Sequence, residues 1–250
     1  MLEVKNVTAG YGNQIVLDGV NANFEKGKLT SIIGVNGCGK STLLKTLINI
    51  LPLFDGKIEV DGKDILSMRR NDIAKKISYL AQEKNTPDMT VMQMVMHGRF
   101  SYLNYPRRYT NRDREIAYTA MEKLGISDLA HKPIFELSGG MRQNAYIAMA
   151  LAQDTDYILL DEPTAYLDIS HQLNLMRILR ELADSGKGIV AVMHDLPLAF
   201  DFSDKLAIIN SGSIVAQKTP SEISVSGVVE DIFGVRIKNT QENKYSYQYL

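Results

Sequence analysis

The sequence predicts an α/β protein with a mostly parallel sheet, an N-terminal antiparallel β-subdomain and an inserted helical subdomain. In the second half of the chain, short apolar runs alternate with helical segments, which is typical of a parallel sheet covered on both faces. In residues 2–65, strand-like alternation and glycine turns dominate instead. Between these parts, from residue 83 to about residue 152, helical spacing prevails and strand signals are few.

The N-terminal segments are expected to be antiparallel strands. Residues 2–8 alternate apolar and polar side chains, as a half-buried strand does, and residues 16–24 resume this alternation after a glycine turn. Asp61-Gly62 is a strong turn signal. Residues 57–65 are therefore predicted to form a hairpin.

A glycine-rich motif lies between a predicted strand and a predicted helix. Residues 34–42 fit the pattern G-x-x-x-x-G-K-S/T, the phosphate-binding P-loop. An apolar run at residues 29–33 precedes the motif, and leucines at helical spacing follow it until Pro52. Glycines allow turns with positive φ and let backbone N–H groups approach phosphate oxygens, while the helix N-terminus adds partial positive charge.

This motif predicts a P-loop NTPase core that binds a nucleoside triphosphate. Thr42 stands where a dinucleotide-binding fingerprint would need Gly or Ala after Gly37 and Gly39, so that alternative fails. The residues expected to hold the triphosphate are Gly34, Asn36, Gly37, Cys38, Gly39, Lys40, Ser41 and Thr42.

The apolar strand predicted from residue 157 ends in two carboxylates, Asp161 and Glu162. Asp161 ends this strand, at the carboxyl edge where parallel sheets bind ligands. Asp161 is a candidate for holding Mg²⁺ through water, with the Ser41 hydroxyl as a direct ligand. Glu162, one residue on, points differently and is the candidate for polarising the attacking water. An acidic turn without function is the alternative for an isolated Asp-Glu pair, and the upstream P-loop argues against it.

A second anion-binding end is predicted at Ser138-Gly139-Gly140. These residues precede a helix expected at residues 142–153, and they offer a hydroxyl, bare backbone N–H groups and a helix N-terminus. Ser138 acting only as an N-cap would explain the motif in isolation. Two such ends in one chain suggest instead that the loop of one molecule faces the Ser-Gly-Gly of another across a two-fold axis, giving two shared sites.

The composition and charge narrow the class of protein. The chain has 250 residues, 45% of them apolar and 23% charged, a soluble globular profile. Its net charge of −1 gives no overall field favouring nucleic acid or an anionic membrane, and no apolar run is long enough to span a bilayer. The first six residues lack the apolar core of a signal peptide, and the single cysteine excludes an internal disulfide. These features predict a cytoplasmic protein.

Residues 1–237 are expected to form the nucleotide-binding domain, with the helical subdomain inserted at about residues 84–152. The remaining residues, 238–250, are polar with three tyrosines. Such a composition at a chain end predicts a loosely held tail.

Taken together, the motifs resemble the nucleotide-binding ATPase subunit of ABC transporters. The resemblance covers residues 1–237 and rests on Leu137-Ser138-Gly139-Gly140 upstream of the apolar strand that ends in Asp161-Glu162-Pro163. It implies that Tyr11 stacks on adenine. The implied catalytic residues are Glu162, His194, which contacts the γ-phosphate, and Gln82, which meets the reaction centre. The implied metal ligands are Ser41, Gln82 and Asp161. The residues implied to act between two copies are Ser138, Gly139 and Gly140, on the partner copy's ATP, and Asp168 in the loop Ala165-Tyr166-Leu167-Asp168.

Three further stretches resemble the branch of this family that imports iron chelates, namely ferric siderophores, haem or cobalamin. They are residues 96–99, 136–142 and 161–172, and residues 151–155 and 233–235 also resemble this branch. The implied protein is an ATP-hydrolysing subunit that uses Mg²⁺ and lies on the cytoplasmic face of the membrane. Its implied partners are a second copy of itself, integral-membrane permease subunits and, indirectly, an extracytoplasmic substrate-binding protein.

Some alternatives stay open at the level of the sequence. Val35, Ala81 and Met141 depart from the usual family pattern, although none of these changes removes a phosphate or metal ligand. A soluble ABC-type ATPase, for example in iron–sulfur cluster assembly, and a non-catalytic nucleotide-binding regulator are the rival functions. A nucleic-acid-binding module is supported only by a cluster of arginines that is more typical of a solvated helix face or a partner contact, so no nucleic-acid partner is expected. That cluster comprises Arg107, Arg108, Arg112 and Arg114.

Overall fold

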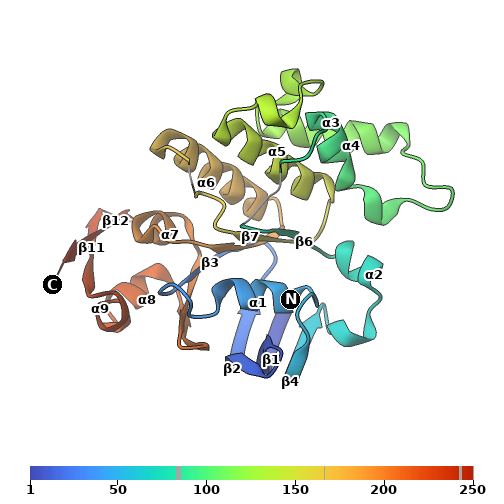
Figure 1. Cartoon of the computed structure of the whole chain (residues 1–250). Coiled ribbons are helices and arrows are strands. Elements are labelled where there is room, and N and C mark those ends of the chain that lie inside the picture. Colours follow the sequence, from blue (N-terminus) through green and yellow to red (C-terminus); the bar gives the residue numbers. More distant parts are fainter. Residues whose placement is uncertain (83–85, 166, 242–243, 250) are drawn as a thin grey trace.

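A six-stranded sheet forms the centre of the molecule. The computed structural model describes residues 1–82, 86–165, 167–241 and 244–249. The strands of the central sheet are β3 (Leu29–Ile33), β6 (Ile77–Leu80), β7 (Tyr157–Asp161), β8 (Gly188–Val192), β9 (Lys205–Asn210) and β10 (Ser213–Lys218). Their order is β10-β9-β3-β8-β7-β6, and all neighbours are parallel except β10, which is antiparallel to β9 (Figure 1). β3, β7 and β8 are buried along their whole length, which explains why their sequences are mostly apolar.

A second, antiparallel sheet comes from the N-terminal part of the chain. Its order is β2-β1-β4-β5, with bounds β1 (Leu2–Tyr11), β2 (Gln14–Phe24), β4 (Leu53–Val60) and β5 (Lys63–Asp64). The helix α1 (Lys40–Leu47) lies between the two sheets (Figure 1), and its buried leucines join both in one apolar core. The predicted hairpin is confirmed: Asp61 and Gly62 both have positive φ, as a two-residue hairpin turn requires, and Val60 pairs with Lys63.

The segment between β6 and β7 is helical, as the sequence predicts. Its helices are α3 (Val91–His97), η2 (Phe100–Tyr102), α4 (Asn111–Lys123), η3 (Ser127–Leu129), η4 (Ile134–Glu136) and α5 (Gly139–Ala152). Thr90 and Thr110 begin α3 and α4 with capping boxes, in which side chain and backbone satisfy each other's hydrogen bonds. This subdomain stands above the central sheet in Figure 1, and its start at residues 83–85 lies outside the described part of the chain.

The remaining helices connect and cover the central sheet. They are η1 (Ile65–Ser67), α2 (Arg70–Ala74), α6 (Ile169–Asp184), α7 (Leu196–Phe202), α8 (Pro220–Ser224) and α9 (Val228–Phe233). No helix in the described ranges combines the length and the apolar character that crossing a bilayer would demand.

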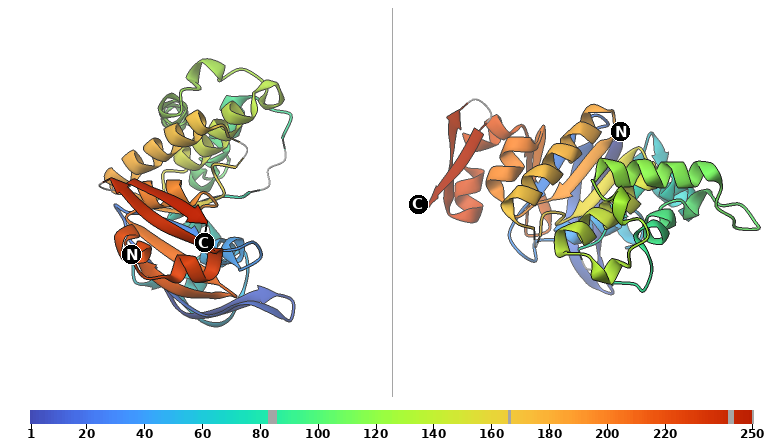
Figure 2. Two further views of the ribbon diagram at one scale, coloured as in Figure 1. Left: turned by 90° about the vertical axis from the view of Figure 1, so that its left-hand side faces the viewer. Right: turned by 90° about the horizontal axis from the view of Figure 1, so that it is seen from above.

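The expectation of a loosely held C-terminal tail is wrong. β11 (Val235–Gln241) and β12 (Lys244–Tyr249) form an antiparallel hairpin at the left of Figure 1, and Figure 2 shows it beside α7 from two further directions. The Tyr245 ring packs on Phe200 of α7 with a centroid separation of 5.2 Å, and the Tyr245 amide donates to Asp201 Oδ1 at 2.8 Å. Alternate residues such as Val235 and Ile237 give the hairpin one buried face, so a polar average composition concealed a strand pattern.

A buried ion pair ties the helical subdomain together. The Arg99 Nε donates to Asp113 Oδ1 at 3.0 Å, and the two side chains are only 7% and 9% exposed. Arg99 also donates to the Ala152 carbonyl at 3.0 Å, so it links the ends of α3 and α5 to the start of α4. Burial opposes ionisation of Asp113, but hydrogen bonds from Thr110 and Arg99 outweigh it and hold its pKa below the usual value.

Replacing Asp113 by Ala is expected to lower the free energy of unfolding by about 3–5 kcal/mol, because the Arg99 charge would stay buried without its partner. Asp184→Ala is the matched control, since Asp184 pairs with Arg180 but its side chain is 64% exposed, and its loss should cost less than about 1 kcal/mol. Urea denaturation followed by circular dichroism measures both. Equal losses in the two variants would contradict the structural role of the buried pair.

Candidate functional site

One cleft gathers most of the predicted site residues. It has a volume of about 380 Å³ and lies at the carboxyl edge of the central sheet. The loops after β3, β6, β7 and β8 all reach it, because parallel neighbours end at the same edge. The residues that line it are Val16, Asn36, Gly37, Gly39, Lys40, Ser41, Thr42, Gln82, Glu162 and His194.

The P-loop owes its shape to glycine at defined positions. Gly37 and Gly39 have φ of 77° and 110°, values that side-chain-bearing residues rarely adopt. A Cβ at Gly34 would come within 2.3 Å of the Ile209 carbonyl oxygen and 2.7 Å of Cys38 Sγ, so only glycine fits between β9 and the loop. Lys40 Nζ donates to the carbonyl oxygens of Gly34 and Val35, at 2.8 and 3.0 Å, which places its ammonium inside the loop.

Cys38 belongs to the core rather than to the cleft surface. Its thiol is buried, and its side chain packs against the position of Gly34. Burial raises the pKa of the thiol, while the nearby Lys40 charge acts in the opposite direction. The Cys38 backbone N–H donates to the Val35 carbonyl at 3.4 Å, within the loop itself.

A hydroxyl and a carboxylate meet beneath the P-loop. The Ser41 hydroxyl donates to Asp161 Oδ1 at 3.0 Å, and the Tyr79 hydroxyl lies 3.4 Å from the other carboxylate oxygen. Burial raises the pKa of Asp161, an effect that these hydroxyl hydrogen bonds partly offset. This pair of oxygen donors suits Mg²⁺, which prefers hard oxygen ligands and keeps several waters or phosphate oxygens of its own. In the described part of the chain, no three His, Cys, Asp or Glu side chains form a metal cluster.

Glu162 lies at the centre of the cleft wall, held from two sides. Gln82 Nε2 donates to Glu162 Oε2 at 2.6 Å, and His194 Nε2 lies 2.5 Å from Oε1. Glu162 has a φ of 52°, in the left-handed region that costs free energy for any residue except glycine. The turn directly after β7 thereby directs this carboxylate away from Asp161 and toward Gln82 and His194.

The Ser-Gly-Gly motif forms a separate cluster outside this cleft. The Ser138 hydroxyl accepts from the Met141 amide and caps α5, while Asp168 accepts from the His171 amide and caps α6. A Cβ on Gly140 would lie 3.2 Å from the His171 ring, and that ring's Nδ1 is 2.8 Å from Asp168 Oδ2. Tyr166, which the sequence placed in the same loop, lies outside the described residues.

The two clusters are joined through the loop that follows β7. Gln143 Nε2 of α5 donates to the Pro163 carbonyl at 2.7 Å, and Gln172 Nε2 of α6 donates to the Thr164 carbonyl at 3.2 Å. The backbone that carries Glu162 is therefore hydrogen-bonded to the helices that begin at Ser138 and Asp168.

The comparisons with known proteins agree with this geometry. A family model described as ABC transporter matches residues 17–165, more than half of the chain. The chain belongs to the ABC transporter family. The ferric enterobactin transport ATP-binding protein FepC of Escherichia coli is 41% identical to it, over 94% of this chain and 88% of FepC.

Solved structures of ABC proteins share the fold. One is described as a metal-chelate type ABC transporter in an inward-facing conformation, with a TM-score of 0.83, 27% identity and coverage of 100% of this chain and 96% of the other. Another is a dimeric bacterial ABC transporter cassette, with a TM-score of 0.77, 27% identity and coverage of 88% and 99%. The predicted fold class is confirmed, and the protein is an ABC-type ATPase.

Tyr11 lies at the end of β1, outside the wall of the cleft in this ABC protein. Its side chain is half exposed, and Lys45 Nζ is 5.9 Å from the ring centroid. Val16, across the same β1–β2 hairpin, lines the cleft directly. An adenine stacked on Tyr11 would therefore extend the nucleotide beyond the P-loop toward the antiparallel sheet.

Sequence reasoning missed some residues of this ABC site. The sequence pattern does not single out Tyr79, because its contact with Asp161 depends on the pairing of β6 with β7. It does not single out His171 either, because nothing in the pattern ties this histidine to a catalytic position, yet it lies between Gly140 and Asp168. Its position three residues after an N-capping Asp was the available signal, since that spacing brings both side chains to the first turn of one helix.

Lys40→Ala is expected to weaken ATP binding roughly 10- to 100-fold, because a hydrogen bond to a charged group contributes about 1.5–3 kcal/mol. Titration with a fluorescent ATP analogue measures the affinity. Lys63→Ala, at the start of β5, removes the same charge outside the cleft and should leave the affinity unchanged. An unchanged affinity in the Lys40 variant would contradict the placement of the triphosphate in this loop.

Proposed function

We propose that this protein powers the import of an iron chelate by hydrolysing ATP as a dimer bound to membrane permease subunits. The observation that carries the ATPase mechanism is the Glu162 carboxylate held between Gln82 and His194 beside the P-loop. The chelate is supported by the likeness to FepC, the ATP-binding protein of ferric enterobactin transport, and to a metal-chelate type ABC transporter of known structure.

The P-loop would hold the phosphates of ATP. Its backbone N–H groups and the N-terminus of α1 offer partial positive charge, and Lys40 adds a full one. Lys40 would exchange its two carbonyl acceptors for phosphate oxygens, which are better partners for an ammonium group because they are charged. Tyr11 would stack on the adenine from the edge of the antiparallel sheet.

Ser41, Asp161 and Gln82 would hold Mg²⁺. When bound, this ion neutralises charge on the β- and γ-phosphates. Ser41 would offer a direct oxygen ligand, and the buried carboxylate of Asp161 would act through water. Tyr79 keeps the Asp161 carboxylate oriented toward Ser41 by its hydrogen bond to the second oxygen.

Glu162 would polarise the water that attacks the γ-phosphate. A general base must lie within hydrogen-bond reach of the proton that it removes, and Glu162 lines the same cleft as the P-loop. Gln82 and His194 hold its two oxygens in place. His194, which also lines the cleft, would donate to the γ-phosphate once the nucleotide is present.

Two copies would share each ATP. Ser138, Gly139 and Gly140 begin α5 outside their own cleft, which leaves their hydroxyl and N–H groups available to the ATP of a partner copy. Asp168 caps the neighbouring helix and would contact the partner beside them. The dimeric cassette among the related structures supports this arrangement. ATP would favour the closed dimer because it binds that state more tightly, and hydrolysis would release it.

A groove next to Gln82 would receive the permease. It has a volume of about 450 Å³ and lies between the end of α1, α2 and β6. Ile50 at its rim is strongly exposed, and Tyr79 in its wall precedes Gln82 by three residues. Docking there would place the protein on the cytoplasmic face of the membrane. The extracytoplasmic substrate-binding protein would act on it only through the permease.

Glu162→Gln is expected to lower ATP turnover roughly 10²- to 10⁴-fold, because the amide cannot accept the proton of the attacking water. ATP binding should persist, since the change keeps the size of the side chain and leaves the P-loop intact. A phosphate-release assay measures turnover, and Glu181→Gln on the exposed face of α6 is the matched control. Normal turnover in the Glu162 variant would show that another group acts as the base.

A further inference from the structure

A loop of unusual charge leaves the helical subdomain between η2 and α4. Residues 100–112, named here the arginine loop, contain three arginines and no acidic residue, although the whole chain has a net charge of −1. In Figure 1 this loop extends to the right, away from the sheets, and the view from above in Figure 2 shows the same projection.

The arginine loop is anchored at both ends and exposed at its tip. The Tyr102 hydroxyl donates to the Gln153 carbonyl at 3.0 Å, and Tyr109 packs against the core of the helical subdomain. Between these anchors, residues 104–108 are all exposed, and Tyr105 is 98% exposed. The anchors make the tip a defined surface feature.

The exposed tip carries two cations, and an aromatic ring at the base of the loop lies close to one of them. The guanidinium carbon of Arg107 lies 4.5 Å from the centroid of the half-exposed Phe100 ring. Within the described ranges, neither Arg107 nor Arg108 forms an ion pair with an acidic side chain. The nearest acidic group in sequence, Asp113, is buried and already paired with Arg99.

At the base of the loop, other charged residues have local partners. Arg114 donates to Asn111 within the first turn of α4. Arg112 lies in a separate depression, whose wall also carries Glu115 and Asp154. The uncompensated charge of the arginine loop is therefore that of Arg107 and Arg108.

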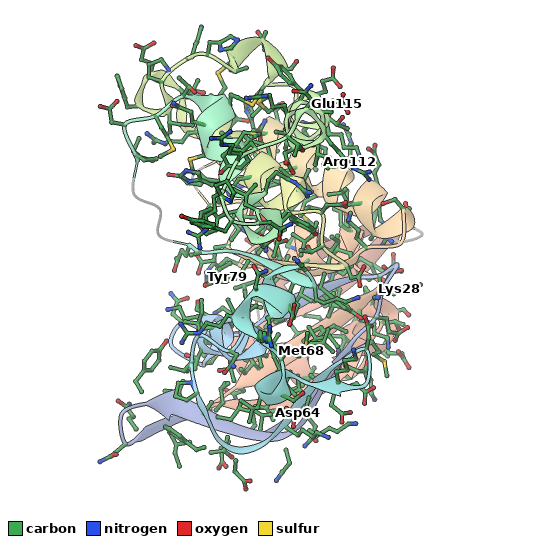
Figure 3. All side chains as sticks on the ribbon, turned by 90° about the vertical axis from the view of Figure 1, so that its right-hand side faces the viewer. Lys28, Asp64, Met68, Tyr79, Arg112 and Glu115 are labelled. Carbon is green, nitrogen blue, oxygen red and sulfur yellow. The ribbon has the colours of Figure 1, made fainter. Side chains whose placement is uncertain are left out.

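The arginine loop rises from the same face as the groove described above. Gln153, whose carbonyl anchors Tyr102, lines that groove, and Lys75 at the end of α2 lies 5.5 Å from the centroid of the Tyr102 ring. Figure 3 looks onto this face, with Tyr79 of the groove near its middle and Arg112 above it. Whatever docks in the groove thus has the arginine loop beside it.

We propose that the arginine loop binds the anionic phospholipid headgroups of the membrane next to the docked permease. This inference rests on the proposed function, because a permease seated in the groove turns this face toward the bilayer. Each Arg or Lys near an anionic surface is attracted to it, and a guanidinium binds phosphate oxygens in bidentate fashion. Exposed Tyr and Phe side chains beside the cations fit the boundary between headgroups and acyl chains.

A nucleic acid is the less suitable occupant. Nucleic-acid sites need a basic surface that follows several successive phosphates, and here two unpaired arginines lie on a chain that is slightly acidic overall. Two cations and the exposed Tyr105 ring on a single projecting tip, with Phe100 beside Arg107, match a flat anionic layer better than an extended polyanion.

Cosedimentation of the purified full chain with lipid vesicles tests the proposal without a permease. Vesicles made of equal parts phosphatidylglycerol and phosphatidylcholine should bind the wild-type chain at low salt, and phosphatidylcholine vesicles should not. Arg107→Ala with Arg108→Ala should weaken binding to the anionic vesicles about 30-fold, or about fivefold for each arginine. At high salt the charge contribution is screened, so Tyr105→Ala should weaken the vesicle binding that remains in the otherwise wild-type chain.

The matched control is Lys218→Ala with Lys238→Ala, which removes the same charge from exposed positions on β10 and β11 and should leave vesicle binding unchanged. Equal binding to neutral and anionic vesicles, or equal losses in the control and the arginine variant, would overturn the proposal. The proposal would also be overturned if the chain bound single-stranded DNA tightly through the arginine loop but did not bind anionic vesicles.

ATP turnover without lipid separates this inference from the proposed function. Both double variants should hydrolyse ATP at the wild-type rate, since none of these residues lies in the cleft. Loss of vesicle binding with normal turnover supports the arginine loop as a membrane contact. Normal turnover with no vesicle binding by the wild-type chain would overturn the loop assignment and leave the ATPase function standing.

Discussion

The structure depends on one constraint: neighbouring parallel strands end at the same edge of a sheet. Because β6, β7, β8 and β3 are adjacent, the residues that follow them meet although the helical subdomain separates them in sequence. Lys40 follows β3, Gln82 follows β6, Glu162 follows β7 and His194 follows β8, and all four line one cleft. The left-handed conformation of Glu162 completes the arrangement, since it turns that carboxylate away from Asp161 and toward its two partners. This conformation costs free energy. It persists because β7 is fixed between β6 and β8 in the sheet, which determines where the turn after β7 must lie.

The sequence predicted the fold well wherever the pattern was local. Mostly apolar runs identified β3 and β7, because strands buried on both faces show little of the polar alternation of a half-buried strand. Asp61-Gly62 identified its hairpin because few residues tolerate two successive positive φ values. The C-terminal hairpin was missed for the opposite reason. Its stability comes from docking Tyr245 on α7, a contact between distant parts of the chain that composition does not reveal.

The sequence predicted the part of the functional site in which backbone groups bind the ligand, namely the P-loop. A P-loop binds phosphate through N–H groups and glycine conformations, so its sequence pattern is nearly a description of its geometry. Gln82, His194 and Asp168 were assigned through family resemblance, since a single polar residue after a strand carries no such pattern. Tyr79 and His171 were missed because their contacts arise from strand register and helix packing. The separation of Ser138 from the cleft was expected from the idea of shared sites, although a single chain cannot contain the partner that completes them.

The central claim is that each ATP is held by the P-loop of one copy and by Ser138 of the other. A crystal structure of the Glu162→Gln variant with ATP and Mg²⁺ tests it most directly, since slow hydrolysis preserves the closed state. The account predicts a two-fold dimer in which Ser138 Oγ of one copy lies about 3 Å from a γ-phosphate oxygen bound to the other. A structure with ATP in both clefts and Ser138 distant from every γ-phosphate would contradict it.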